Sequence, residues 1–229
     1  MPELPEVQAV VNHYKPVFLK QKIERISNPN SYSKVFATHT LPKLNKNVGG
    51  QLIKDVFRRG KYIVLQTEKG YLCIHLRMTG QLQESLDSFV ADKHCSFAIH
   101  LNTGKTIYFK DYRKFGRLYY YSTLDTLNAK LGVEPFSTEF SFVYVAGILK
   151  KSAGMIKPLL LNQKYIAGLG NIYVDEALWL AKIHPKKKSN SISKTKVKVL
   201  TRSIPDILKK AIDFNGTTII NFSYGRMKN

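Results

Sequence analysis

The chain has 229 residues and carries 36 Lys and Arg against 16 Asp and Glu, a formal net charge of +20. Hydrophobic residues make up 44% of it, which excludes a disordered chain. No apolar stretch approaches the roughly 18 residues needed to cross a bilayer. The two cysteines, Cys73 and Cys95, cannot form a four-cysteine zinc site and suit a reducing cytoplasm. The length allows one large domain or two small ones.

The positive charge is unevenly distributed and favours a polyanionic partner. From Lys182 to Asn229 there are 12 Lys and Arg against 2 Asp, a net charge of +10. The stretch KDYRKFGRLYYY at 110–121 alternates basic and aromatic residues, and such rings stack on or wedge between bases. Nucleic acid is therefore the expected partner, and a merely solvated basic surface is the alternative. An acidic membrane is disfavoured, because the sequence has no amphipathic basic anchor.

The chain opens with MPELPEV, which is no signal peptide but suits the start of a helix. Proline is tolerated in a first turn, and Glu3 and Glu6 suit the positive end of a helix. Apolar residues at helical spacing continue this pattern over 7–20. A second interpretation concerns the chain without Met1, because Pro2 would then carry a free secondary amine with two carboxylates close by.

Short apolar or alternating runs follow the first helix, and turn residues such as Gly separate them. Closely spaced runs of this kind predict the strands of an antiparallel sandwich or barrel. The runs occupy residues 51–58, 61–67, 71–78, 95–101, 105–112 and 116–122.

The pattern changes near 131–140, after which helical spacing dominates. Ser193 is an expected N-cap and Gly216 an expected C-terminal stop of the last helix. The sequence therefore predicts an N-terminal β domain with one leading helix and a C-terminal helical domain. The expected helices occupy residues 142–151, 155–166, 171–183 and 193–216.

A glycine turn, AGLG at 167–170, separates two of these helices, and Asn171 begins the second one. Glycine permits backbone torsions and close approaches that other residues do not allow. The N-terminus of the second helix offers free N–H groups and a positive dipole end, which suit an anion such as a DNA phosphate. The alternative is an ordinary helix hairpin that Asn171 caps.

Five motifs in one order resemble the formamidopyrimidine-DNA glycosylase / endonuclease VIII family. They are MPELPEV at 1–7, RGKYIVL at 59–65, HLRMTG at 75–80, DYRKFGRL at 111–118 and AGLGNIY at 167–173, and the resemblance extends to about Phe222. Together with the predicted elements, it implies an α+β fold. A two-layer antiparallel β-sandwich with a leading helix would occupy 1–130, a linker 131–139, and a helical domain with a helix–two-turns–helix motif 140–229.

The resemblance assigns catalytic roles to four residues. In the family, the initiator Met is removed and the N-terminal proline is the nucleophile, which places that role on Pro2. A secondary amine can attack C1′ of the sugar and form an iminium. Glu3 matches the general acid/base and Glu6 a second carboxylate that orients the terminus. Lys61 matches a lysine that contacts the phosphate beside the lesion, although by itself it would be read as a surface lysine.

A base inside a duplex cannot reach Pro2, so its nucleotide must be flipped out and the hole filled. Met78, Arg113 and Phe115 match the void-filling residues of the family. Met is an adaptable plug, Phe wedges a base step, and Arg can hydrogen-bond the orphaned base. Lys114, between two of them, is also expected to bind DNA. Met78 and Phe115 would otherwise be read as core residues.

Three residues of the helical region complete the expected site. Asn171 matches a phosphate-binding residue of the family, and Lys157 lies in the tripeptide IKP, where the family also has lysine. Glu176 matches an acidic position near the active site and is expected to play a supporting role.

The sequence departs from the family at two points. Relatives usually carry a four-cysteine zinc finger after the stretch matched by NGTTIINF, whereas this sequence ends at Asn229 with only two cysteines. We therefore expect no zinc finger, no bound metal and no cofactor. Position 77 is Arg where many relatives have Gly.

The resemblance implies a bifunctional DNA glycosylase and abasic-site lyase for oxidised purines such as 8-oxoguanine and formamidopyrimidines. Its expected partner is double-stranded DNA with oxidised bases or abasic sites, and we expect a cytoplasmic monomer without a membrane partner, nucleoid-associated if bacterial. The alternatives are an oxidised-pyrimidine glycosylase of the endonuclease VIII type and a non-catalytic binder of damaged or abasic DNA.

Overall fold

The computed structural model describes residues 1–85 and 91–214 of the chain. These residues form two compact units. The β unit contains Met1–Pro2 and Glu6–Leu124, and the helical unit contains Glu3–Pro5 and the described residues from Asp125 onward. Each unit has its own hydrophobic core. The expected helix stop Gly216 and the stretch NGTTIINF lie outside the described residues.

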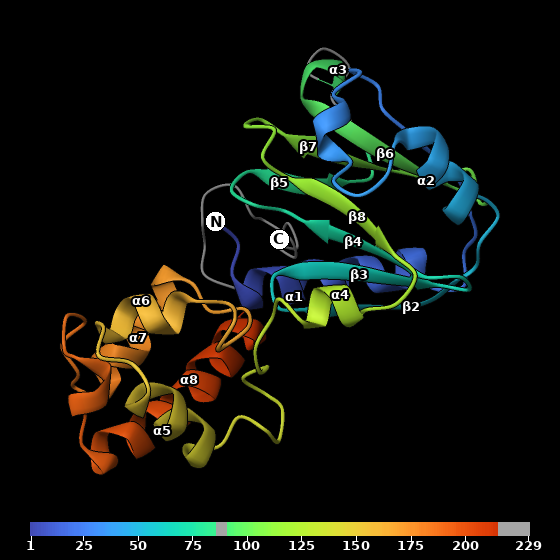
Figure 1. Ribbon diagram of the computed structural model, residues 1–229. Helices are drawn as coiled ribbons and strands as arrows, with labels where there is room; N and C mark the ends of the chain where they lie inside the picture. Colours follow the sequence, from blue (N-terminus) through green and yellow to red (C-terminus); the bar gives the residue numbers. More distant parts are fainter. Residues whose placement is uncertain (86–90, 215–229) are drawn as a thin grey trace. The chain divides into compact units, whose positions relative to one another are not determined.

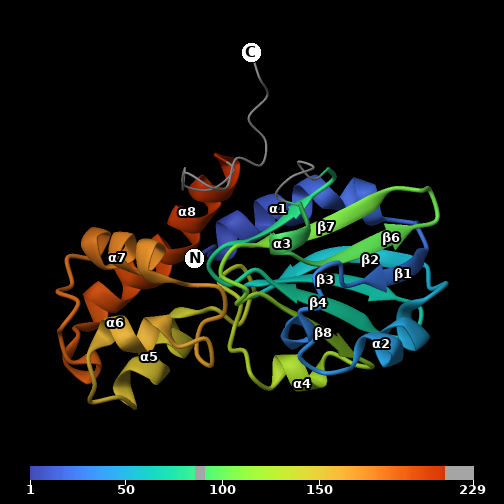
Figure 2. The ribbon, with the colours of Figure 1, turned by 90° about the horizontal axis from the view of Figure 1, so that it is seen from above.

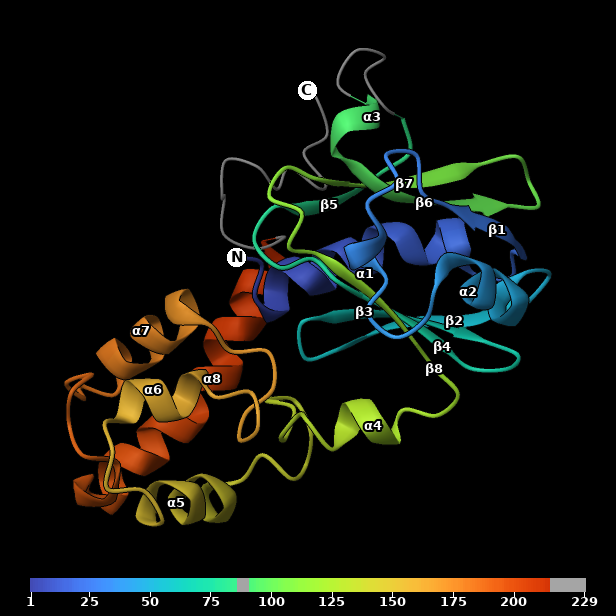
Figure 3. The same cartoon turned by 45° about the horizontal axis from the view of Figure 1, so that its top comes forward.

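The described part of the β unit is a two-layer antiparallel sandwich with a leading helix, α1 (Leu4–Phe18), as the sequence predicted. Figure 1 gives the course of the chain, and Figure 3 shows the two sheets as separate layers. One sheet has the order β1-β6-β7-β5 and the other β2-β3-β4-β8. The strands are β1 (Ile23–Ser27), β2 (Ile53–Arg59), β3 (Tyr62–Thr67), β4 (Tyr71–His75), β5 (Gly80–Gln83), β6 (Cys95–Leu101), β7 (Thr106–Asp111) and β8 (Arg117–Tyr121).

The core of the β unit joins α1 to both sheets. The buried face of α1 follows the helical spacing of its apolar residues, because side chains three and four positions apart share one face. Residues of β2, β3, β4 and β8 meet residues of β6 and β7 in the same cluster. Three short helices, η1 (Ser33–Val35), α2 (Leu41–Val48) and α3 (Ala91–His94), connect strands. The α1 side chains in the core are Val7, Val10, Val11, Tyr14 and Phe18.

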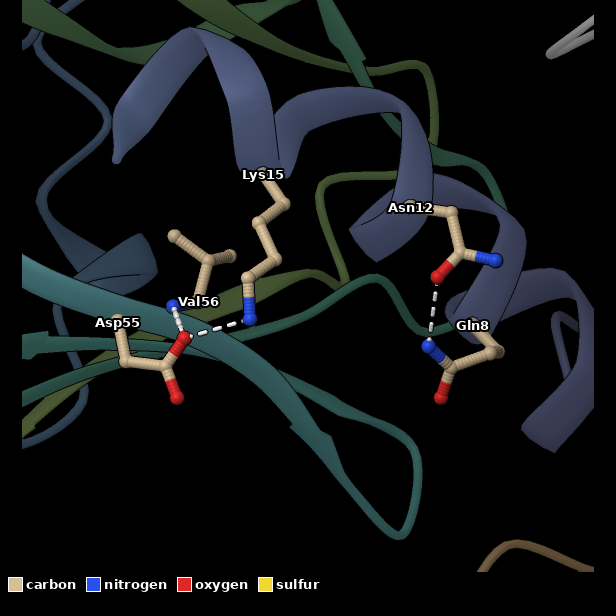
Figure 4. Close-up of polar contacts among 5 residues, drawn as sticks. All are labelled: Gln8, Asn12, Lys15, Asp55 and Val56. Carbon is tan, nitrogen blue, oxygen red and sulfur yellow. Dashed lines mark hydrogen bonds and ion pairs between the residues drawn. The ribbon is translucent and has the colours of Figure 1, made fainter.

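An ion pair joins the polar face of α1 to β2 (Figure 4). Lys15 Nζ lies 2.6 Å from Asp55 Oδ1, and this oxygen also accepts a hydrogen bond of 2.8 Å from the backbone N–H of Val56. The hydrogen bond from Lys15 lowers the pKa of the Asp55 carboxyl. Both side chains are partly exposed, so the pair positions α1 more than it stabilises the fold.

Two strands were not predicted from the sequence, and one predicted strand is too long. The run at 71–78 was expected to be one strand, but β4 ends at His75. Arg77 has φ +56°, a left-handed conformation that turns the chain, and β5 begins at Gly80. A Cβ at Gly80 would lie 2.5 Å from both Leu76 O and the Phe109 ring, so this position requires glycine. The other unpredicted strand, β1, has the mostly polar sequence IERIS.

The helical unit consists of five α-helices among its described residues, and α8 packs against both α5 and α7 (Figure 2). Ser193 caps α8 as predicted, since its side chain accepts from the N–H of Lys196. The helix expected over 155–166 is shorter and stops before Asn162, whose side chain accepts from the N–H of Lys164 and forms a turn. The helices are α4 (Asp125–Asn128), α5 (Phe142–Lys150), α6 (Ile156–Leu161), α7 (Asn171–Leu180) and α8 (Lys194–Asp213), with η2 (Ser189–Ser191) before α8.

The helices of the described residues include none that combines the length and apolar character of a membrane span.

Replacing Asn45 by Ala tests how the edge strand β1 is held. The Asn45 side chain accepts from Ile26 N at 2.6 Å and donates to Ile26 O at 2.8 Å, which ties α2 to β1. We expect Asn45→Ala to lower the free energy of unfolding by about 1–3 kcal/mol, because it removes the side-chain partners of both the N–H and the C=O of Ile26. Urea unfolding measures this. Asn47→Ala on the same helix is the control and should stay within about 0.5 kcal/mol of wild type.

Candidate active site

Glu3 occupies the N-terminus of α7 within the helical unit. Its carboxylate accepts hydrogen bonds from the backbone N–H of Ile172 at 3.0 Å and of Tyr173 at 3.4 Å. The side chain is only 3% exposed. An ionised carboxylate suits this place, because the first N–H groups of a helix lack partners within the helix and carry the positive end of its dipole. Glu3 is thereby held at a fixed position directly after Pro2.

The AGLG turn is shaped to receive the N-terminal residues. A Cβ at Gly170 would lie 2.2 Å from Glu3 Cδ, so only glycine lets this carboxylate approach the helix. Gly168 has φ +92°, and its carbonyl accepts from Leu4 N at 3.0 Å. Leu4 is fully buried in the core of the helical unit. The two glycines are therefore required by close contact with Glu3 and Leu4.

This arrangement corrects part of the interpretation of the turn. The N–H groups of Ile172 and Tyr173 were expected to be free for a phosphate, but Glu3 takes them. Asn171 does not cap the helix either: Gly170 is the N-cap, and Asn171 is the first helical residue. The Asn171 side chain is exposed at this end of α7.

The two other predicted residues of the helical unit do not meet each other. Lys157 on α6 forms an ion pair of 2.8 Å with Asp175 on α7. Glu176, the next residue along α7, is exposed. Lys157 is thus held beside α7 by a carboxylate that sequence analysis did not single out.

In the β unit, Pro2, Glu6 and Lys61 are all buried. Lys61 follows the tight turn between β2 and β3, where Gly60 has φ +56°, and its side chain is 4% exposed. Glu6 lies in the first turn of α1 and is 2% exposed. Buried charged side chains are uncommon and are retained where they are paired or functional. Burial therefore distinguishes Lys61 from the surface lysine that the sequence alone would suggest.

His75, at the end of β4, lies beside two cationic side chains. Burial lowers the pKa of the imidazole, and the charges of Arg77 and Lys61 lower it further, to about 3. Its Nδ1 accepts from the backbone N–H of Arg77 at 3.0 Å, so the neutral ring carries its proton on Nε2. The ring also packs edge-on against Tyr62. His75 is thus a neutral donor next to two cations.

The three predicted void-filling residues come together on the surface of the β unit. Met78 lies between β4 and β5, and Arg113 and Phe115 lie between β7 and β8. The Arg113 guanidinium donates to Met78 Sδ at 3.0 Å and lies 4.6 Å from the centre of the Phe115 ring. Met78 and Phe115 are 43% and 45% exposed, so neither is a core residue. Two apolar side chains and one cation therefore form a single exposed cluster.

Asp111 is a positioning residue that sequence analysis missed. Its buried carboxylate accepts from the hydroxyl of Thr79 at 2.5 Å, from Arg113 N at 3.2 Å and from Gly116 N at 2.7 Å. It thus joins the loop of Met78 to the loop of Arg113. One signal was present in the sequence: Asp111 continues the inward alternation of Ile107 and Phe109 along β7, and a carboxylate facing a core must find donors.

Lys114 lies in the same loop and points away from the cluster. Its φ is +55°, and its ammonium group lies 5.1 Å from the centre of the Tyr32 ring. The Tyr32 hydroxyl donates to Lys114 O at 2.8 Å. The loop therefore presents Arg113 and Phe115 on one side and packs Lys114 on Tyr32.

Metal ligands do not cluster in residues 1–85 and 91–214: no group of three or more His, Cys, Asp or Glu is placed to hold an ion.

Comparison with known proteins identifies the class to which this sandwich and this helical unit belong. Residues 1–118 match the formamidopyrimidine-DNA glycosylase N-terminal domain, and residues 131–223 match the H2TH domain of the same enzymes. The chain therefore belongs to the formamidopyrimidine-DNA glycosylase family. The expected fold, including the helix–two-turns–helix motif, is confirmed.

Individual relatives cover nearly the whole chain. The formamidopyrimidine-DNA glycosylase of Protochlamydia amoebophila is 40% identical over 96% of this chain and 79% of its own length. That of Lactococcus lactis subsp. lactis is 39% identical over 97% of this chain and 82% of its own.

Solved structures of similar proteins contain damaged DNA. A MutM complex with DNA containing carbocyclic 8-oxo-G is 38% identical, with a TM-score of 0.88 over 99% of this chain and 85% of that one. A Lactococcus lactis enzyme bound to FAPY-dG DNA is 36% identical, with a TM-score of 0.86 over 96% of this chain and 84% of that one.

The lowered pKa of His75 predicts a pH dependence of stability. The imidazole is harder to protonate in the folded chain than in the unfolded chain, so its contribution is fully present above about pH 6.5. This contribution is lost as the pH falls toward 3. We expect the NMR resonances of the His75 ring to remain unchanged between pH 5 and 8. A ring that titrates near pH 6.5 would contradict this.

Replacing Asp111 by Asn tests how the loop of Met78 is connected to the loop of Arg113. An amide nitrogen cannot accept the hydrogen bonds that the carboxylate oxygen accepts, so at least one buried donor loses its partner. We expect urea unfolding to show a loss of about 1–3 kcal/mol. The exposed Asp206 on α8 offers the control Asp206→Asn, which should change stability by less than about 0.5 kcal/mol.

Proposed function

We propose that this protein is a bifunctional DNA glycosylase and abasic-site lyase that excises oxidised purines in base excision repair. The observation that carries the proposal is full-length similarity to formamidopyrimidine-DNA glycosylases, with Glu3 held on α7 directly after Pro2. The substrate is duplex DNA that contains 8-oxoguanine, formamidopyrimidine or an abasic site. Solved relatives hold DNA with these lesions, which supports the assignment.

Pro2 is the proposed nucleophile once Met1 has been removed. Its neutral secondary amine attacks C1′ of the damaged nucleotide, the N-glycosidic bond breaks, and the base leaves with a proton. The C1′–O4′ bond of the sugar then breaks, O4′ takes a proton, and the nitrogen lone pair forms the iminium with C1′. The iminium draws electrons from the opened sugar and permits β-elimination and then δ-elimination of the two phosphates. Hydrolysis of the last imine returns the free amine.

Glu3 is the proposed general acid/base. Proton transfer from a positioned carboxyl group contributes typically 10²–10⁴-fold to a rate. The N–H groups of α7 hold the Glu3 carboxylate in one position. The side chain therefore needs no reorientation before it transfers a proton to the sugar ring oxygen. Glu6 is proposed to orient the amine, and Lys61 to bind the phosphate beside the lesion.

The exposed cluster of Met78, Arg113 and Phe115 is proposed to fill the duplex after the base flips out. Two apolar side chains replace stacking, and Arg113 pairs with the orphaned base. Because Arg113 donates a hydrogen bond to Met78, the cluster is preorganised for binding DNA. Lys114 and Lys157 are proposed to strengthen binding to the DNA backbone, Asn171 to bind a phosphate, and Glu176 to support the site.

The protein is proposed to act as a monomer in the cytoplasm. Cys73 and Cys95 are both buried thiols, as suits a reducing compartment.

Borohydride trapping is the experiment that tests this function. Borohydride reduces the iminium to a stable amine, and mass spectrometry of the adduct locates the link. We expect adducts at Pro2 with both an 8-oxoguanine duplex and an abasic duplex. An adduct with the abasic duplex alone would mean that the protein is an abasic-site lyase that does not excise the damaged base. Tight binding without any adduct would indicate a non-catalytic binder, and faster excision of thymine glycol than of 8-oxoguanine would favour the pyrimidine-type enzyme.

Replacing Glu3 by Gln separates the two chemical steps. Gln keeps an oxygen that can accept from Ile172 N, so the fold is retained, but it cannot give up a proton as a carboxyl group does. We expect excision of 8-oxoguanine to slow by at least about 100-fold. Cutting at an abasic site should persist in part. Glu139→Gln, an exposed change in the helical unit, is the control. Excision by Glu3→Gln at the wild-type rate would show that Glu3 is not the general acid/base.

A further inference from the structure

Arg77 adopts a backbone conformation that favours glycine. It is one of five non-glycine residues with positive φ among the described residues, and its φ is +56°. This conformation is unfavourable for a residue with a Cβ, and such strain persists where something else requires the side chain. Glycine would adopt this turn without strain, so the turn itself does not require arginine.

The turn and the core do not use the Arg77 side chain. Its backbone N–H donates to His75 Nδ1, but this contact would remain with glycine. The side chain is exposed, and no carboxylate of the described residues lies within 4.0 Å of its guanidinium. Within residues 1–85 and 91–214, this cation therefore has no carboxylate partner.

The guanidinium shares its surroundings with a second cation. Arg77 and Lys61 both lower the pKa of His75, so both charges act on the same imidazole. Burial raises the pKa of the Tyr62 hydroxyl, and the Arg77 charge opposes that rise. These two effects place the guanidinium near the Lys61 end of β3. A positive charge at this place attracts an anion.

Arg77 also directly precedes Met78 in the exposed cluster. Met78 contacts Arg113 through its sulfur, so the position of the Arg77 backbone is tied to the DNA-facing loop. A guanidinium at this place has a planar set of donors that matches two oxygens of one phosphate.

We propose that Arg77 binds a backbone phosphate of the DNA, next to the phosphate proposed for Lys61. This assignment rests on the proposed function and extends it. Arg77 contributes affinity for duplex DNA of any sequence, because a phosphate contact carries no base information. Glycine at this position would fit the turn but would remove this contact.

The test compares Arg77 with Lys20, an exposed basic residue with φ +63° at the end of α1. The variants Arg77→Gln and Lys20→Gln each remove one positive charge. The variants Arg77→Gly and Lys20→Gly also remove the backbone strain of a positive φ. Fluorescence anisotropy measures the Kd for an abasic-analogue duplex and for an undamaged duplex as salt is raised. Urea unfolding measures the stability of all four variants.

We expect Arg77→Gln and Arg77→Gly to raise the Kd for both duplexes on the order of tenfold at low salt. The slope of log K against log salt should become smaller in magnitude by about 0.9. The Lys20 variants should bind as wild type does. Both Gly variants should unfold at a urea concentration no lower than wild type, because the strain is removed. Arg77→Gly would then be a variant that binds worse although its fold is intact.

Three results would overturn the proposal. Equal Kd values and slopes for the Arg77 and Lys20 variants would remove Arg77 from the interface. A loss confined to the abasic duplex would assign Arg77 to the orphaned base instead of a phosphate. A lower unfolding midpoint for Arg77→Gly than for Lys20→Gly would give Arg77 a structural role. Failure of the wild-type chain itself to bind the abasic duplex would instead count against the proposed function.

Discussion

The helical unit depends on one interaction, the contact of the Glu3 carboxylate with the N-terminus of α7. A helix N-terminus attracts an anion, and here the anion belongs to the chain itself. This contact explains why the turn before α7 contains glycines, because side chains at Gly168 and Gly170 would collide with Leu4 and Glu3. It also fixes the residue that follows the proposed nucleophile.

The β unit uses a second buried carboxylate in a similar way. Asp111 gathers three donors from two loops and so sets the relative positions of Met78 and Arg113. In both places, an acid inside a strongly basic protein accepts hydrogen bonds from backbone N–H groups. Two of the 16 acidic residues of this chain are therefore used to position backbone segments next to the proposed site.

Local patterns in the sequence predicted the helices and most strands, because apolar spacing and caps such as Ser193 act over a few residues. They failed for β1 and β5, which are short and largely polar and are defined by pairing with β6 and β7. The catalytic candidates came from resemblance to a family. The position of Glu3 on α7 could not come from spacing, because its partner Ile172 lies 169 residues away. The role of Asp111 was equally hidden, since its donors come from loops that only the fold brings together.

The assignment of Glu3–Pro5 to the helical unit has a consequence for how the protein is made. The ribosome synthesises these residues first, yet their binding partners at 166–173 appear only when three quarters of the chain exists. Contacts between distant parts of a chain form late, because a long loop must close first. The extreme N-terminus therefore stays accessible during most of translation. The removal of Met1 that we propose would fall in that interval, before Pro2 is buried.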